Sequence, residues 1–341
     1  MSLCCTAFTR RGIELAQRIC SALGEGEVWS LPKFASMGTE CYTSLSDWTE
    51  DVFAQKHDLL FVGAAGIAVR AIAPCVRDKW SDPAVLSVDE LGSYVIPLLS
   101  GHAGGANRLA RRIAGCIGAT PVISTATDLN QIFAVDEWAV RNGIPVTDKT
   151  AAKAISAALL EGEQLRFASE LPHGPLPLGF SANAFEPDLA LTCRRRERFP
   201  EKALVLHPRL LTVGLGCRRG TEVEVIEKAV LTVLQDHGLS PESVEAFASI
   251  TLKQDEPGFQ ALSERWQLPF HFYTPEELRN LPGVFTASPF VESVTGVDNV
   301  CERSAVLCAQ GGHLMALKTP MGAVTVAVAR RECFFEFTEG G

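Results

Sequence analysis

A glycine-rich stretch with polar residues among its glycines is the segment of this sequence best suited to bind a small molecule. It reads Ser-Gly-His-Ala-Gly-Gly-Ala-Asn over Ser100–Asn107, after an apolar run at Tyr94–Leu99 and before a helical pattern over Arg108–Cys116. Glycines let the backbone approach a ligand, and the first N–H groups of a following helix carry partial positive charge. We therefore expect this strand-to-helix turn to bind a phosphate or carboxylate group.

His102, within this stretch, is its most versatile side chain. A histidine here can act as a general acid or base, bind a metal, or form a hydrogen bond that only stabilises the turn. The sequence leaves these roles open. A nucleotide site is disfavoured, because Gly101, Gly104 and Gly105 do not match GxGxxG and no Gly-Lys-Ser/Thr follows.

Two further glycine turns precede helical patterns, at Gly63–Arg70 and Gly214–Thr221. In the second turn Cys217 is followed by Arg218 and Arg219, and nearby cations and a helix N-terminus lower the pKa of a thiol. We expect the two arginines to contact an anion, whereas catalysis by Cys217 lacks an identifiable histidine partner. The carboxylates nearest apolar segments, each more typical of a helix cap or ion pair than of a catalyst, are Asp82, Asp89, Glu90, Asp128, Asp136 and Glu302.

Apolar runs alternate with helical patterns along most of the chain, which is typical of parallel sheets covered by helices. We expect an α/β protein of two lobes with mostly parallel sheets, joined by an irregular proline-rich middle segment. Four prolines between residues 172 and 187 set this segment apart, because proline removes a backbone donor and resists helix formation. The predicted boundaries are 1–140 for an N-terminal α/β domain, 141–208 for the middle subdomain or linker, 209–332 for a C-terminal α/β domain and 333–341 for a tail.

Hydrophobic periodicity places the elements within these domains. The predicted strands are 4–8, 57–62, 84–88, 94–99, 121–124, 210–213, 244–252 and 270–273, with a hairpin-like pair at 314–318 and 323–329. The predicted helices are 13–23, 67–73, 108–116, 136–142, 223–234 and 299–308.

The amino-acid composition limits the kinds of partner that the protein can bind. The 341 residues are 47% hydrophobic and 21% charged, with a formal net charge of −9. That charge argues against a broad nucleic-acid or anionic-membrane surface, and no run of residues is long and apolar enough to span a bilayer. The eleven cysteines show no CxxC pair or Cys/His ligand spacing. We expect reduced thiols in a cytoplasmic protein, with no metal site of its own.

Taken in order, the motifs resemble those of the CbiG family of cobalamin biosynthesis, the cobalt-precorrin-5A hydrolases of the oxygen-independent pathway. In the first half they are VGAAGIAVRAIAP at 62–74, DKWSDPAV at 78–85, LLSGHAGGAN at 98–107, STATD at 124–128 and AVD at 134–136. In the second half they are VGLGCRRGT at 213–221, LKQDE at 252–256 and GVDNVCERSA at 296–305. The resemblance runs from about Thr9 to Arg330 and weakens over the proline-rich middle. Cys301 and Ser304 stand where alanine-like residues are more usual.

The resemblance implies a cobalt corrinoid substrate whose ring-A acetate arm has closed a lactone onto the extruded meso carbon. The enzyme opens this lactone and releases the two-carbon fragment as acetaldehyde, giving cobalt-precorrin-5B. Because the cobalt arrives inside the substrate, no separate cofactor is expected. The implied partners are the corrinoid and, transiently, neighbouring enzymes of the pathway. The rival interpretation is a non-catalytic corrinoid carrier or a partner of the pathway's methyltransferases.

The resemblance also assigns roles to residues. His102 is the leading base or axial cobalt contact, with Asp128 or Glu302 as alternative bases. The residues expected to bind the substrate's carboxylate arms and ring lie in or near the glycine turns: Gly63, Gly66, Arg70, Lys79, Ser100, Gly101, Gly104, Gly105, Asn107, Arg108, Gly216, Cys217, Arg218, Arg219 and Lys253.

Overall fold

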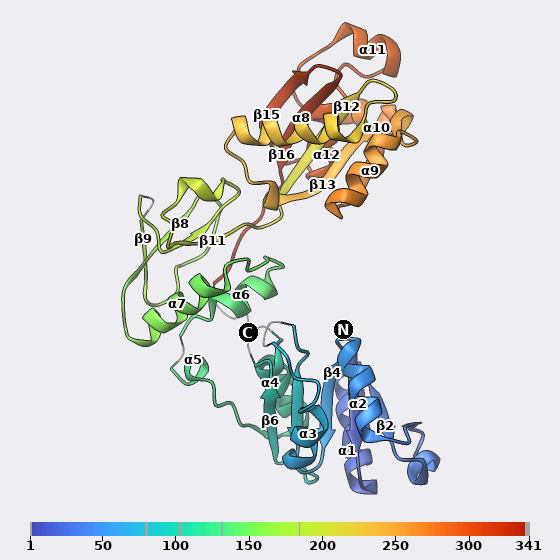
Figure 1. The fold of residues 1–341 in the computed structure, drawn as a ribbon, viewed down its shortest axis with the longest axis vertical. Helices are drawn as coiled ribbons and strands as arrows, with labels where there is room; N and C mark the ends of the chain where they lie inside the picture. Colours follow the sequence, from blue (N-terminus) through green and yellow to red (C-terminus); the bar gives the residue numbers. More distant parts are fainter. Residues whose placement is uncertain (1, 79–80, 102–103, 131, 184, 338–341) are drawn as a thin grey trace. The chain divides into compact units, whose positions relative to one another are not determined.

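The computed structural model describes residues 2–78, 81–101, 104–130, 132–183 and 185–337 (Figure 1). Contacts within the chain divide it into two compact units, Met1–Val140 and Arg141–Gly341, and each is described by itself. Within the described ranges, no helix has the length and apolar character needed to cross a membrane.

The described residues of the first unit form a seven-stranded sheet of order β3-β2-β1-β4-β5-β6-β7. Its strands are β1 (Leu3–Ala7), β2 (Glu27–Ser30), β3 (Glu40–Cys41), β4 (Asp58–Val62), β5 (Val85–Val88), β6 (Tyr94–Leu99) and β7 (Thr120–Pro121). Neighbouring strands are parallel except β5 and β6, which are antiparallel. As a result, β6 and β7 run against the other five strands, and the carboxyl end of β6 lies beside the amino end of β5.

Helices cover both faces of this sheet. They are α1 (Arg10–Leu23), α2 (Leu45–Ala54), α3 (Ala65–Ile72) and α4 (Ala106–Ile117), with a 3-10 helix at Pro32–Met37. Two further helices, α5 (Ala126–Leu129) and α6 (Val135–Arg141), follow β7 along the chain. Apolar side chains of α1 and α4 pack in one core cluster, and those of α2 and α3 pack in another on the opposite face. The predicted strands and helices of this unit are confirmed, although β7 is shorter than predicted.

The middle of the chain is more regular than the sequence predicts. It holds a four-stranded parallel sheet of order β11-β10-β8-β9. Its elements are α7 (Lys149–Leu160), β8 (Leu165–Ser169), β9 (Phe180–Ala182), β10 (Leu189–Leu191), a 3-10 turn at Arg196–Arg198 and β11 (Leu204–Leu206). The four prolines lie in the connections between β8, β9 and β10. They therefore separate short strands of a regular sheet, and the prediction of an irregular segment holds only for these connections.

The remainder of the second unit is built on a five-stranded sheet of order β14-β13-β12-β16-β15. Its strands are β12 (Leu211–Cys217), β13 (Val244–Ile250), β14 (Phe270–Tyr273), β15 (His313–Met321) and β16 (Val324–Arg330). Its helices are α8 (Val223–Asp236), α9 (Pro257–Trp266), α10 (Pro275–Asn280), α11 (Pro289–Thr295) and α12 (Cys301–Cys308), with 3-10 turns at Pro241–Ser243 and Thr251–Lys253. Strands β12, β13 and β14 are parallel, and the predicted hairpin β15–β16 joins β12 in antiparallel fashion.

Strand β12 extends further than predicted and includes two of the turn glycines. Gly214 pairs with Ala327 and Gly216 with Thr325 inside the sheet. A Cβ atom at Gly214 would overlap the carbonyl oxygen of Cys301 at the start of α12. These glycines therefore allow α12 and the neighbouring strand to approach closely, and the ligand-facing turn begins only after Cys217.

The end of the described chain packs against the middle sheet. Phe335 and Phe337 are buried, and the Phe337 ring lies 5.3 Å from that of Phe167 on β8 in an edge-to-face contact. The Phe335 N–H donates to the Pro172 carbonyl, and its own carbonyl accepts from the Gly174 N–H. The predicted tail thus contributes, up to Phe337, to the core of the middle sheet.

Phe337→Ala should lower the free energy of unfolding by about 3 kcal/mol, because it removes a buried ring from this core. Phe334→Ala is the matched control, since Phe334 lies in the same segment with 59% of its surface exposed. Urea unfolding of the two variants checks this. Equal destabilisation by both would contradict the packing role of the terminal segment.

Candidate functional site

Three sequence motifs that lie far apart in the chain meet at one edge of the N-terminal sheet. Because β6 is antiparallel to β5, Leu99 pairs with Val85, the first residue of β5. Asp82, just before β5, and Ser100, just after β6, are therefore neighbours at this edge. The Ser100 hydroxyl donates a hydrogen bond to the Asp82 carbonyl oxygen at 2.9 Å.

The glycine loop uses part of its own backbone hydrogen-bonding capacity. Gly105, with φ of +81°, is the N-cap of α4 and has no competing side chain. The Ala106 N–H donates to the Ser100 carbonyl at 3.1 Å and the Asn107 N–H donates to the Gly101 carbonyl at 3.0 Å. These are the first two N–H groups of α4. The loop itself satisfies both groups, so neither is available to an anion.

Asn107 joins this loop to the third motif. Its side chain is 1% exposed, and its Nδ2 donates to Thr125 Oγ1 at 2.9 Å. A Cβ atom at Gly101 would lie 2.9 Å from Asn107 Oδ1, and one at Gly104 would overlap the Cβ of Ser100. The glycines at these two positions are therefore required for the loop to pack on itself.

A pocket of about 650 Å³ lies beside this loop, between the end of α2 and the segment after α3. Asp82 lines it and is 6% exposed. Its Oδ2 accepts hydrogen bonds from the backbone N–H groups of Arg77 at 2.8 Å and Asp78 at 3.0 Å. The Asp82 carboxylate thus bonds to Arg77 and Asp78, and we refer to the described residues Arg77, Asp78, Ser81 and Asp82 as the 77–82 turn. Arg77, Ser81 and Asp82 form a wall of the pocket.

Asp58 at the same edge was not singled out by sequence reasoning. It is the first residue of β4, and its Oδ1 accepts from the Ala84 N–H at 3.2 Å. Burial raises the pKa of this carboxyl, and the Ala84 hydrogen bond and the more distant Arg108 guanidinium oppose the shift. The sequence signal that could have identified Asp58 is an acidic residue at the first position of the otherwise apolar strand β4.

Some predicted residues lie outside what the structure describes. His102 and Lys79 fall in the undescribed positions, and only the backbone of Asp128 is described, within α5. Their predicted roles stay predictions. The segments that flank His102 and Asp128 are joined through Asn107 and Thr125.

The turn at Gly63–Gly66 lies at the opposite edge of the sheet. Gly63 follows the carboxyl end of β4, and its N–H donates to the Val88 carbonyl at the carboxyl end of β5. A five-residue strand spans roughly 15 Å, so the structure does not bring this turn to the Ser100 loop. The Arg70 guanidinium donates to the Gly66 carbonyl in its own helix at 3.3 Å.

The second unit has its own candidate cluster, at the carboxyl ends of β12 and β13. Glu256 is 4% exposed and accepts from the Gly220 N–H at 2.7 Å and from Lys253 Nζ at 3.3 Å. This carboxylate fixes the turn that carries Arg218 and Arg219, both exposed. Ligands of open α/β sheets bind at the carboxyl ends of the strands, so this turn is well placed to receive one.

The thiol of Cys217 is less reactive than its arginine neighbours suggest. Burial raises its pKa to about 11, Lys253 opposes the shift, and the Glu256 carboxylate adds to it. The expectation of a lowered thiol pKa is therefore wrong, because the side chain lies half-buried at the end of β12 while the arginines are exposed.

Glu302 is completely buried and its carboxylate is fully engaged. It accepts four hydrogen bonds: from the Thr286 N–H at 2.7 Å, Thr286 Oγ1 at 2.8 Å, Asn299 Nδ2 at 2.8 Å and the Lys318 N–H at 2.6 Å. A carboxylate offers about four acceptor positions. This bonding is that of a group that fastens the 286 loop and β15 to α12, with no acceptor position left for a substrate proton.

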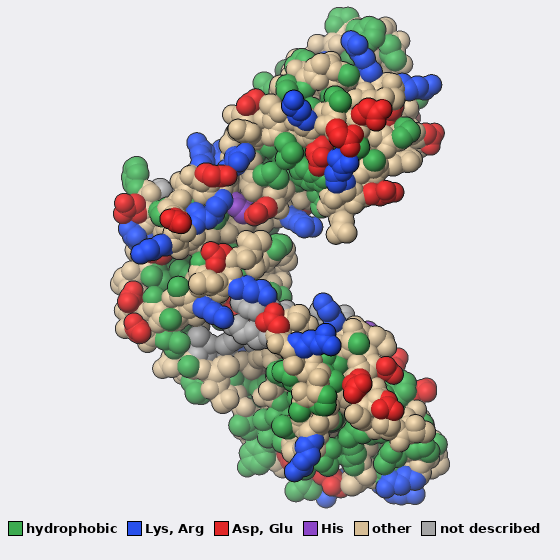
Figure 2. Space-filling model, viewed as in Figure 1, with side chains coloured by type: hydrophobic (Ala, Val, Ile, Leu, Met, Phe, Trp, Pro, Cys, Tyr) green, Lys and Arg blue, Asp and Glu red, His purple; other side chains and the backbone are tan. Residues whose placement is uncertain are grey.

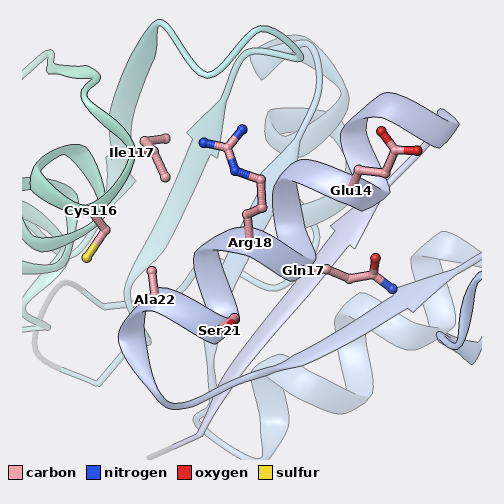
Figure 3. Close-up of a pocket in the computed structure, with 7 residues that line it drawn as sticks. All are labelled: Glu14, Gln17, Arg18, Ser21, Ala22, Cys116 and Ile117. Atoms are coloured by element: carbon pink, nitrogen blue, oxygen red, sulfur yellow. The ribbon is translucent and has the colours of Figure 1, made fainter.

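A second groove in the first unit is lined by none of the predicted site residues. The groove between α1 and α4 is lined by Glu14, Gln17, Arg18, Ser21, Ala22, Cys116 and Ile117 (Figure 3). Basic and acidic side chains are interspersed on the face shown in Figure 2. Among the residues that the structure describes, no three or more His, Cys, Asp or Glu are grouped as metal ligands.

Comparison with known proteins assigns the family. Residues 47–128 match the family Cobalamin synthesis G N-terminal, and residues 211–329 match Cobalamin synthesis G C-terminus. The chain is 34% identical to cobalt-precorrin-5A hydrolase of Salmonella typhimurium, covering 96% of this chain and 98% of that protein. It is 30% identical to the enzyme of that name from Priestia megaterium, covering 95% and 93%. The chain belongs to the cobalamin synthesis G family.

One solved structure resembles the chain over nearly all its length. It is a cobalamin biosynthesis protein G homolog from Sulfolobus solfataricus, 21% identical, with 97% of each chain covered and a TM-score of 0.42. Within the cobalamin synthesis G family, the N-terminal match takes in the Asp78–Val85, Leu98–Asn107 and Ser124–Asp128 motifs, and the C-terminal match takes in the Gly220–Glu256 cluster.

Gly104→Ala should destabilise this family member by about 2 kcal/mol, because the added methyl group overlaps Ser100 in a packed loop. Gly115→Ala, in the helix α4 that follows this loop, should stabilise the protein by about 1 kcal/mol, since Gly115 is exposed with open space around it. Thermal and urea unfolding of both variants check the pair. A neutral Gly104→Ala would contradict the steric role of this glycine.

Alkylation of Cys217 should be slow at neutral pH and should accelerate about tenfold for each pH unit between pH 7.5 and 9.5. Only the thiolate reacts, and a thiol whose pKa is about 11 remains mostly protonated throughout that range. Iodoacetamide labelling followed by peptide mass spectrometry measures the rate, with a free cysteine peptide as reference. A rate that levels off above about pH 9, as the peptide's does because its pKa is about 8.5, would refute the raised pKa.

Proposed function

We propose that this protein hydrolyses cobalt-precorrin-5A in the oxygen-independent route to cobalamin. It opens the ring-A acetate lactone and releases the two-carbon fragment as acetaldehyde, yielding cobalt-precorrin-5B. Support comes from relatives of that name aligned over nearly the whole chain. The structural observation that carries the placement of the site is the junction of three family motifs through Ser100–Asp82 and Asn107–Thr125 hydrogen bonds.

The reaction sets three chemical requirements. A base removes a proton from water as its oxygen bonds to the lactone carbonyl carbon, and donors stabilise the oxyanion that forms. Breaking the acyl C–O bond then frees the acetate arm as a carboxylic acid and leaves an alkoxide on the two-carbon fragment. As that alkoxide becomes the aldehyde, the carbon–carbon bond to the macrocycle breaks, and the macrocycle with its cobalt accepts the electron pair.

We assign the base to His102, with Asp128 as the alternative, because both belong to segments that meet at the amino edge of the N-terminal sheet. His102 is also the residue we propose for any axial contact with the substrate cobalt. Glu302, the third residue expected to act as a base, is better suited to maintaining the fold, since its four hydrogen bonds occupy its oxygens.

Cations in both units are proposed to bind the substrate's acetate and propionate arms. The proposed cations of the first unit are Lys79 and Arg108, and those of the second unit are Arg218, Arg219 and Lys253 in the turn cluster. The cobalt is supplied by the substrate, so no separate cofactor is proposed. A cytoplasmic location fits the eleven cysteines, all of which are free thiols.

The second candidate function is a corrinoid carrier or methyltransferase partner without catalytic activity. It would use the same carboxylate-binding cations but would require no base. The Asn107 side chain is buried and bonds to Thr125. A loop fixed in this way favours the enzyme, because catalytic groups must be held in a defined geometry.

Purified protein incubated with cobalt-precorrin-5A should release acetaldehyde in proportion to substrate consumed. His102→Ala should lower kcat by about 100-fold, the loss typical of removing a general base. His271→Ala, on an exposed position of β14, is the control and should leave kcat unchanged.

Tight corrinoid binding by the wild-type protein with no acetaldehyde would favour the carrier. Acetaldehyde release that is undiminished in His102→Ala would remove His102 from the chemistry and transfer the role to Asp128, which Asp128→Asn then tests.

A further inference from the structure

Ser100 adopts a backbone conformation that normally belongs to glycine. Its φ is +58°, and the other described non-glycine residues with positive φ are Lys56, Gln267 and Gln310. Those three are exposed, whereas Ser100 is 8% exposed. A side chain in this region disfavours the fold by roughly tenfold in the unfolding equilibrium relative to glycine. A serine retained here therefore calls for a compensating use of its side chain.

The hydroxyl of Ser100 supplies that use. It donates to the Asp82 carbonyl oxygen at 2.9 Å, and both residues are buried. The Ser100 carbonyl accepts from the Ala106 N–H at the start of α4. One residue thus bonds the turn before β5 through its side chain and the helix after β6 through its backbone.

The described residues of the 77–82 turn are bonded to one another. The Asp82 carboxylate accepts from the N–H groups of Arg77 and Asp78, and the Asp78 carbonyl accepts from the N–H groups of Ser81 and Asp82, so displacement of Asp82 would disturb all of these bonds. Arg77, Ser81 and Asp82 line the 650 Å³ pocket. The hydrogen bond of the Ser100 hydroxyl to Asp82 accordingly connects this pocket wall to the loop that precedes His102 in the sequence.

We propose that Ser100 is a positioning residue: its hydroxyl fixes the 77–82 turn and the pocket it lines against the glycine loop that carries the proposed base. This inference rests on the proposed hydrolase function for its effect on turnover. It assigns Ser100 no direct contact with the reacting atoms. The compensation explains why serine, rather than the conformationally relaxed glycine, stands at this position.

Ser100→Ala and Ser100→Gly separate the hydroxyl from the backbone strain. Both variants lose the hydrogen bond to Asp82, but only the alanine variant keeps a side chain at positive φ. The glycine variant should therefore unfold at a midpoint several degrees above that of the alanine variant. Both should lose at least tenfold in kcat for acetaldehyde release. Activity then follows the hydroxyl while stability follows the backbone.

Gln310→Gly is the matched control for strain. Gln310 has φ of +55° and is exposed just after α12 in the second unit. It belongs to neither the glycine loop nor the Gly220–Glu256 cluster. This variant should match or exceed wild-type stability and keep wild-type kcat. A Ser100→Gly variant that also keeps wild-type kcat would overturn the positioning role.

Hydrogen exchange tests the clamp without relying on turnover. In both Ser100 variants the backbone amides of Arg77 and Asp78 should exchange about tenfold faster, while that of Leu60 in the centre of β4 should be unchanged. Unaltered exchange at Arg77 and Asp78 would overturn the inference even if activity fell. Faster exchange with full activity would overturn it as well.

Failure of the proposed function gives a different pattern. If the wild-type protein releases no acetaldehyde, the hydrolase proposal fails, and the exchange experiment alone decides whether Ser100 fixes the 77–82 turn. If the wild type is active and the activity of both variants falls only in parallel with their stability, Ser100 has a purely structural role.

Discussion

The antiparallel pairing of β5 with β6 is the constraint on which the N-terminal site depends. Only Asp89–Ser93 connects the two strands, and a parallel arrangement needs a crossover of a dozen or more residues. Asp89 closes the tight turn by accepting from the N–H groups of Leu91, Ser93 and Tyr94. This turn reverses β6 and so delivers the glycine loop to the amino edge of β4 and β5. There the loop contacts Asp82. A parallel β6 would instead have carried the loop to the opposite edge of the sheet, away from Asp82.

The sequence predicted most elements of this fold and its mostly parallel sheets, but not the reversal of β6. Periodicity located β14 at its observed bounds and placed α1, α4 and α8 to within a few residues, because each buries one regular apolar face. Periodicity did not predict α2, because acidic residues separate its apolar positions. Those positions, Leu45, Trp48, Val52 and Phe53, nevertheless follow helical spacing. The short connection before β6 was visible in the sequence. Its consequence, that glycine turns 63–66 and 100–105 lie at opposite edges, requires the strand pairing.

The site residues divide in the same way. Local patterns predicted the Ser100 loop and the Arg218–Arg219 turn, because each is marked by glycines or cations within one short stretch of the sequence. The roles of Asp82, Glu256 and Glu302 depend on partners up to 36 residues away, as in the Glu256–Gly220 hydrogen bond. The prediction of a lowered thiol pKa at Cys217 was wrong for a related reason. Its neighbours along the chain are cationic, but burial within the fold dominates its pKa.

The charge distribution of the second unit suggests how an acidic protein can receive a polycarboxylate. Several of its other arginines pair with carboxylates: Arg166 with Asp188, Arg265 with Glu224 and Glu227, Arg303 with Asp298, and Arg331 with Glu245. At the turn after β12, the buried carboxylate is Glu256, and its two oxygens are engaged by the Gly220 N–H and Lys253. A carboxylate so occupied competes weakly for Arg218 and Arg219. The bond that shapes the turn therefore also keeps its guanidinium groups available to an anionic ligand.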